Sequence, residues 1–119
     1  MAPEPSAPLR ARVEVDALEL PTPACDDVTL LVSELVTNSV VHADLDAGQD
    51  IDLRISRSPR IVRVEVCDDG PGFAGAPLEG GSTAGHGFGL YLVEQLADRW
   101  GINRDTQTCV WFELDLPRA

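Results

Sequence analysis

Three polar residues recur at four-residue spacing in an otherwise apolar stretch: Glu34, Asn38 and His42. On a helix, this spacing places a carboxylate, an amide and an imidazole in one stripe. Such a stripe needs a polar partner, and an amide oxygen is a ligand that a divalent cation accepts. The alternative is a helix face that simply meets solvent.

A second carboxylate, Asp68, ends a row of alternating valines at positions 62, 64 and 66. The period of two predicts a strand in which Asp68 shares the apolar face. A carboxylate there is costly unless hydrogen-bond donors satisfy it, and an amino group on a bound ligand would do so. The alternative is that Asp68 caps the turn formed by residues 68–72.

Thr108 stands at the polar end of a similar row, formed by Val110, Phe112 and Leu114. Alternation places these four side chains on one face of a strand. Two apolar faces that each end in an inward polar residue suggest a common pocket.

Eight glycines lie between positions 70 and 89, which predicts a long loop with few core residues. Gly85, Gly87 and Gly89 precede a predicted helix, so free N–H groups and the helix dipole can hold phosphate oxygens there. A dinucleotide fingerprint is excluded because Leu90 occupies its third glycine position and no strand comes before it. The lysine of a P-loop is also missing.

The stretch from Val64 to Asp98 contains six acidic residues and neither lysine nor arginine. A polyphosphate bound there would need a divalent cation to offset its charge. Asn38, on the polar stripe, is the candidate oxygen ligand for that ion.

Apolar periodicity predicts the elements that must position these residues. Residues 10–20 fit either an edge strand or a short helix. The remaining elements are a helix capped by Asp26 or Asp27 and reaching about residue 43, a hairpin of residues 51–56 and 61–69, a helix of residues 88–99, and a last strand of residues 109–116.

Length and composition indicate one globular domain. The chain has 119 residues, of which 44% are apolar, and we expect a flexible tail at residues 1–8 before a single domain at 9–119. No apolar run is long enough for a membrane span. The formal charge of −11 argues against direct contact with nucleic acid. Three widely spaced cysteines (Cys25, Cys67 and Cys109) favour reduced thiols over a disulfide framework or a zinc site.

Together, three segments resemble the N, G1 and G2 boxes of the ATPase superfamily that includes gyrase, histidine kinases and mismatch-repair ATPases (the GHKL superfamily). They are Glu34-Leu-Val-Thr-Asn38, Asp68-Asp-Gly-Pro-Gly72 and Gly85-His-Gly-Phe-Gly89. Residues 33–42 and Val110-Trp-Phe-Glu are most similar to the bacterial anti-sigma factor serine/threonine kinases. The resemblance implies an α+β fold, a two-layer α/β sandwich of the Bergerat ATP-binding type, whose mixed and mainly antiparallel sheet has helices on one face.

The resemblance also implies a role for each matching residue. Glu34 matches the catalytic base that activates an attacking hydroxyl, and Asn38 matches the Mg²⁺ ligand. Asp68 matches the carboxylate that binds the adenine amino group, with Thr108 near the adenine. Five glycines match positions that shape the turn under the nucleotide or serve the phosphates: Gly70, Gly72, Gly85, Gly87 and Gly89.

The expected activity is that of a cytoplasmic protein serine/threonine kinase that uses ATP and Mg²⁺. Its expected partners are an anti-sigma antagonist, which it phosphorylates, and a sigma factor; the resemblance also allows a homodimer. Two features depart from the family pattern: the segment before residue 25 is short and broken by proline, and the loop of residues 71–85 is short for this family and lacks a basic residue. ATP binding is therefore better supported than phosphoryl transfer, and the alternative is an ATP-binding partner-switching module without significant kinase activity.

Overall fold

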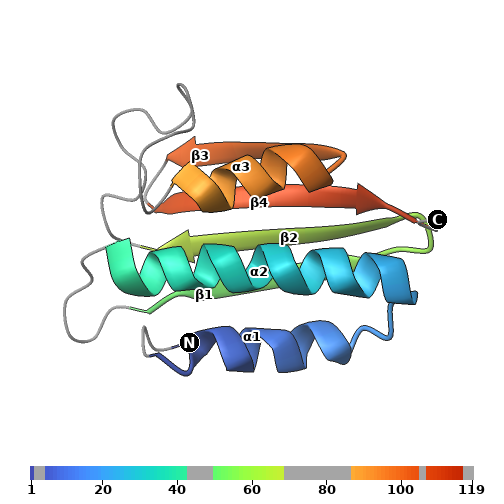
Figure 1. Ribbon diagram of the computed structural model, residues 1–119, viewed down its shortest axis with the longest axis horizontal. Coiled ribbons are helices and arrows are strands. Elements are labelled where there is room, and N and C mark those ends of the chain that lie inside the picture. The colour runs from blue at the N-terminus through green and yellow to red at the C-terminus, as the bar shows by residue number, and fades with distance from the viewer. Residues whose placement is uncertain (2–4, 43–49, 69–86, 105–106, 117–119) are drawn as a thin grey trace.

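The computed structural model describes residues 1, 5–42, 50–68, 87–104 and 107–116 of the chain. It is an α+β fold, in which a four-stranded antiparallel sheet of order β1-β2-β4-β3 is covered on one face by helices (Figure 1). The elements are α1 (Ala7–Asp16), α2 (Thr22–His42), β1 (Asp52–Arg57), β2 (Ile61–Asp68), α3 (Gly87–Leu96), β3 (Arg99–Arg104) and β4 (Thr108–Asp115). The described strands form only antiparallel pairs.

The predicted hairpin is confirmed as β1 and β2, which pair with Leu53 opposite Val66 and Ile55 opposite Val64. Ser58 closes its turn, because its N–H donates to the Ile61 carbonyl at 2.8 Å and its hydroxyl accepts the Ile61 N–H at 3.1 Å. The last predicted strand is confirmed as β4, which lies beside β2 at the centre of the sheet.

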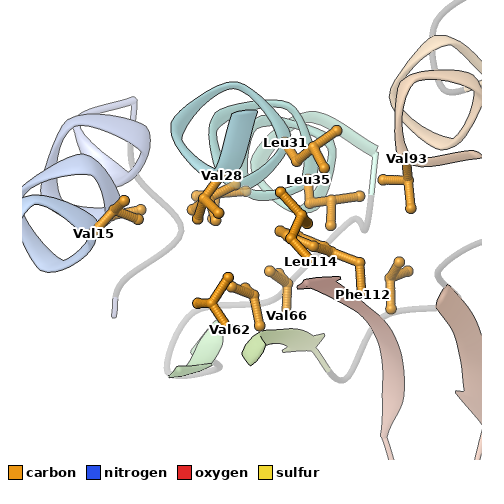
Figure 2. Packing of buried hydrophobic residues seen from close by; sticks show 14 of the residues in the cluster. Val15, Val28, Leu31, Leu35, Val62, Val66, Val93, Phe112 and Leu114 are labelled. Carbon is orange, nitrogen blue, oxygen red and sulfur yellow. The ribbon is translucent and has the colours of Figure 1, made fainter. Parts of the chain in front are cut away.

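The core lies between the inner face of the sheet and helices α2 and α3 (Figure 2). The alternating residues of β2 and β4 supply its lower layer, with Val64 directly opposite Phe112 and both fully buried. Leu31 and Leu35 of α2 and Val93 of α3 supply the upper layer. Burial of these alternating positions sets which face of each strand points inward, and so sets the direction of the polar residues at the strand ends.

The two alternatives for the first segment are resolved in favour of a helix, α1. Ala7, Ala11 and Val15 recur every four residues and are fully buried, and α1 packs against α2. Helix α1 begins two residues before the expected domain boundary at Leu9.

Where the structure describes the chain, no helix is both long and apolar enough to cross a bilayer.

Helix α2 begins at Thr22, so the expected cap at Asp26 or Asp27 is wrong. Pro23 lies in the first turn, where the N–H that proline lacks has no partner within a helix. The Cys25 N–H already donates to the Pro21 carbonyl at 2.8 Å, which carries the helical pattern back past the two aspartates.

The sequence analysis does not predict strand β3, which begins at Arg99, the last residue of the second predicted helix. Helix α3 ends at Leu96, and Arg99 to Arg104 pairs with β4 instead. Gly101 faces Trp111 there, and a Cβ at Gly101 would lie 2.8 Å from the indole Nε1. A glycine at this position lets the indole lie flat across the strand.

Candidate functional site

Asp68 and Thr108 lie directly opposite each other where β2 ends and β4 begins. Asp68 is buried, and the Ser39 hydroxyl of α2 donates to its Oδ2 at 2.8 Å. The structure therefore brings together the two polar strand ends that alternation predicted, and adds a third polar group from the helix above them. The hydroxyl donor offsets part of the cost of burying this carboxylate, whose two oxygens can accept several hydrogen bonds, including one from a ligand amino group.

Asn38 is buried although it belongs to the polar stripe, so this part of the stripe is not a solvated helix face. Its Nδ2 atom has no hydrogen-bond partner among the described residues. A buried polar atom without a partner costs about 1–3 kcal/mol, which a ligand at that position would recover. The two ends of a side-chain amide can exchange places by a flip, so Asn38 can offer an oxygen. The residue therefore fits a Mg²⁺ ligand.

Glu34 lies one helical turn before Asn38 and is half-buried. It lines a groove of about 470 Å³ between α1 and α2. Arg12 forms part of the groove and donates from Nε to the Ser33 hydroxyl at 3.0 Å. The carboxylate of Glu34 is thus reachable from outside the molecule, as a base for an incoming hydroxyl would have to be. The side chain of His42 lies outside the described part of the chain.

The structure describes only two of the five glycines that were expected around the nucleotide. Helix α3 begins at Gly87, so Gly87 and Gly89 lie in its first turn, where unpaired N–H groups and the helix dipole favour an anion. Gly70, Gly72 and Gly85 lie outside the described residues.

Sequence reasoning missed Ser39, and the signal was present. Val32, Leu35 and Val36 form the inward stripe of α2, and Ser39 continues that stripe at helical spacing. A serine on an apolar helix face indicates a polar partner on the opposite side of the core. That partner is Asp68.

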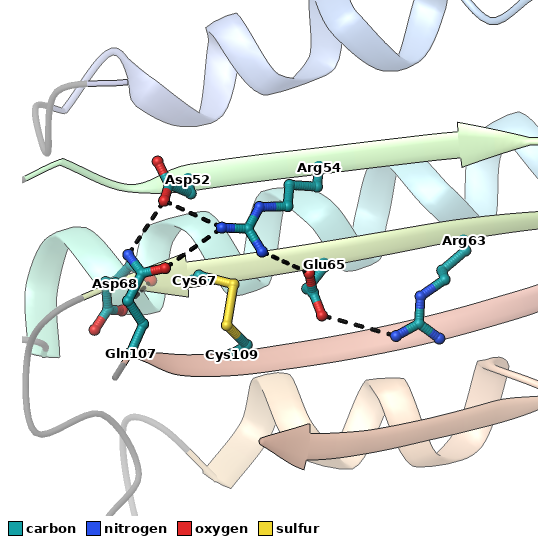
Figure 3. Close-up of a disulfide and its surroundings, with 9 residues drawn as sticks. Asp52, Arg54, Arg63, Glu65, Cys67, Asp68, Gln107 and Cys109 are labelled. Atoms are coloured by element: carbon teal, nitrogen blue, oxygen red, sulfur yellow. Dashed lines mark hydrogen bonds and ion pairs between the residues drawn. A yellow bond between two sulfur atoms is a disulfide. The ribbon is translucent and has the colours of Figure 1, made fainter. Parts of the chain in front are cut away.

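The expectation of reduced thiols is wrong for two of the three cysteines. Cys67 and Cys109 form a disulfide between β2 and β4, while Cys25 is free (Figure 3). The two residues are 42 positions apart, and only the pairing register places them opposite each other.

The open face of the sheet, away from the helices, carries alternating arginines and carboxylates. Glu113 accepts hydrogen bonds from Arg99 Nε at 2.7 Å and from Arg63 Nη1 at 3.0 Å. The pKa of Glu113 is lowered, chiefly by the hydrogen bond from Arg99. Burial opposes this as the second-largest effect, and the weaker effect of the bond from Arg63 lowers the pKa further. Arg63 also stacks over the Trp111 ring, 4.4 Å from its centroid.

Comparison with known proteins agrees with this geometry. Residues 3–114 match the family model described as a histidine kinase-like ATPase domain, and the chain belongs to that family. One similar solved structure is the histidine kinase domain from the Erythrobacter litoralis EL346 blue-light activated histidine kinase, with 32% sequence identity and a TM-score of 0.62. The match covers 81% of this chain and 46% of that one, so this chain spans less than half of that structure. No curated protein matches.

Family membership confirms part of the expected function. It supports an ATP-binding domain, and ATP binding in this superfamily usually involves Mg²⁺. The antiparallel sheet with its layer of helices is the fold expected of that superfamily.

Proposed function

We propose that the protein is a Mg²⁺-dependent serine/threonine kinase that phosphorylates a small anti-sigma antagonist and also binds a sigma factor. One observation carries the nucleotide part of this proposal. The buried Asp68, held by Ser39 and opposite Thr108, lies close to the helix segment that holds Asn38, whose Nδ2 atom has no hydrogen-bond partner among the described residues. A carboxylate, a hydroxyl and a side-chain amide in one buried region match the needs of an adenine amino group and a metal-bound phosphate.

In the proposed complex, Asp68 accepts a hydrogen bond from the adenine amino group and Thr108 lies beside the base. The phosphates extend toward the first turn of α3, where Gly87 and Gly89 leave the backbone N–H groups accessible. Asn38 is the residue that would hold Mg²⁺, and the ion supplies the positive charge that the acidic, lysine-free surroundings lack.

Glu34 is the proposed general base. Its carboxylate accepts the proton of a serine or threonine hydroxyl while that oxygen forms a bond to the γ-phosphorus. The bond between the γ-phosphorus and the bridging oxygen breaks, and ADP leaves with that oxygen. The half-buried position of Glu34 at an open groove supports this role, because a protein hydroxyl must approach from outside.

The test is a phosphoryl-transfer assay with γ-labelled ATP, Mg²⁺ and purified candidate antagonists. The proposal expects label on the antagonist that survives acid, because phosphate esters of serine and threonine are acid-stable. Acid-labile label would instead indicate a histidine acceptor. ATP binding without transfer to any antagonist would favour the alternative, a partner-switching module without significant kinase activity.

A further inference from the structure

The disulfide lies one residue inside the strand ends that carry the proposed adenine site. Cys67 precedes Asp68 in β2, and Cys109 follows Thr108 in β4, so the two pairs are adjacent rungs of one ladder. Alternation places the disulfide on the open face and the Asp68–Thr108 pair on the helix face. Figure 3 shows the disulfide bridging the two strands beside Asp68.

This covalent link also encloses the segment that the proposed function uses for phosphate. The chain between Cys67 and Cys109 contains the glycine-rich residues 70–89 together with α3 and β3. Strand ends fray more readily than strand centres, and Asp68 and Thr108 are terminal residues of their strands. The cross-link therefore holds the spacing of the two residues that would contact the base.

The surroundings of the two sulfur atoms do not favour a bound cation. Within the described residues, Glu65 lies close enough for its carboxylate and both sulfurs to be within 4.8 Å of one another. However, Arg54 and Arg63 already pair with Glu65 at 3.1 Å and 3.7 Å. Two guanidinium groups offset the carboxylate charge that would attract a cation.

We propose that Cys67 and Cys109 form a reversible redox site, and that its disulfide state binds nucleotide more tightly than its dithiol state. This inference rests on the proposed function, because the proposed kinase would act in the cytoplasm, where a disulfide is usually transient. A dithiol reductant would supply two electrons and two protons. Its thiolate attacks one sulfur to give a mixed disulfide, its second thiol releases that sulfur, and the reductant leaves as a disulfide.

The physical cause is preorganisation. With the disulfide closed, the ends of β2 and β4 are held in the binding arrangement before the nucleotide arrives. With the thiols free, binding must also order these ends, which we expect to weaken the affinity for ATP about tenfold, the cost of ordering one or two side chains.

The experiment is calorimetric titration of the full chain with Mg-ATP before and after reduction by a dithiol. Cys67 and Cys109 are buried, so thiol labelling in denaturant counts the states: one free cysteine is expected in the oxidised form and three in the reduced form. Circular dichroism at the titration temperature establishes that both forms are folded. Cys25→Ser should retain the difference between the two states.

Two double variants keep the test valid if one folds poorly: Cys67→Ser with Cys109→Ser, and Cys67→Val with Cys109→Val. Each should bind ATP with the weaker affinity and ignore the reductant. Equal affinity of the oxidised and reduced protein would overturn this inference alone. Absence of ATP binding in both states would contradict the proposed function, and this inference with it.

Discussion

The carboxylate of Asp68 faces the hydroxyl of Ser39 across the core at 2.8 Å, so helix α2 and strand β2 meet through a buried hydrogen bond. This contact joins the element that carries Glu34 and Asn38 to the element that carries the proposed adenine carboxylate. The predictions for the adenine end and for the phosphate end of the nucleotide therefore both depend on this hydrogen bond.

Asn38→Ala should weaken binding of Mg-ATP. The substitution removes the proposed oxygen ligand, and because loss of an outer-shell partner alone costs about 10–100-fold in metal affinity, a loss of at least that order is expected. Titration with and without a chelator measures the effect, and Thr37→Ala, at the exposed neighbouring position, serves as the control. Unaltered ATP affinity in both Asn38→Ala and chelator-treated protein would remove the metal from this site.

Glu34→Gln should leave ATP binding intact and lower phosphorylation of the antagonist by about 10²–10⁴-fold, the usual contribution of a general base. Glutamine keeps the shape of the side chain but cannot take the proton. Single-turnover assays with labelled ATP measure the rate, and Glu94→Gln on the exposed side of α3 is the matched control. A wild-type rate in Glu34→Gln would exclude Glu34 from the chemistry.

Replacing Cys67 and Cys109 by serine should lower the free energy of unfolding by about 4 kcal/mol, because the cross-link closes a loop of 42 residues in the unfolded chain. Urea unfolding of the wild type with and without reductant should show the same loss. A reductant effect that persists in the double variant would assign the stabilisation to something other than this disulfide.

Glu113 should make folding sensitive to acid. Its pKa is lowered in the folded state, chiefly by the hydrogen bond from Arg99, so its stabilisation is present above its unfolded pKa of about 4.5 and is lost as pH falls through the lower folded value. Urea midpoints at pH 7 and at pH 3 measure the loss. Glu113→Gln should reduce the difference between the two midpoints, whereas Glu14→Gln, on the exposed face of α1, should not.

Local sequence patterns correctly predicted the strands in which apolar and polar residues alternate, and the helices in which apolar residues recur every three or four positions. The valines before Asp68 were sufficient to place that carboxylate on the inner face, and the row ending in Thr108 did the same for β4. The pairing of these two residues follows from the register, which is a tertiary property. The Cys67–Cys109 disulfide was missed for the same reason, since residues 42 positions apart become neighbours only after the strands pair.

Strand β3 was missed because its alternation is short, with only Trp100 and Ile102 as inward apolar residues. The segment Arg-Trp-Gly-Ile-Asn-Arg follows directly on the helical spacing of Leu90, Val93 and Leu96. Pairing with β4 overrides that weak local preference, as tertiary context often does. The predicted start of α2 is wrong because a local signal was given too much weight. Asp26 and Asp27 are good capping residues, but they lie inside a helix that begins at Thr22.

Calorimetric titration with ATP in the presence of Mg²⁺, on the wild type and on Asp68→Asn, tests the central claim most directly. The wild type should bind, and Asp68→Asn should bind about 1.5–3 kcal/mol more weakly, the range for a hydrogen bond to a charged group. Asp115→Asn, at the far end of β4 from Thr108, should bind like the wild type. Equal affinity of folded Asp68→Asn and wild type, or no binding by either, would contradict the account.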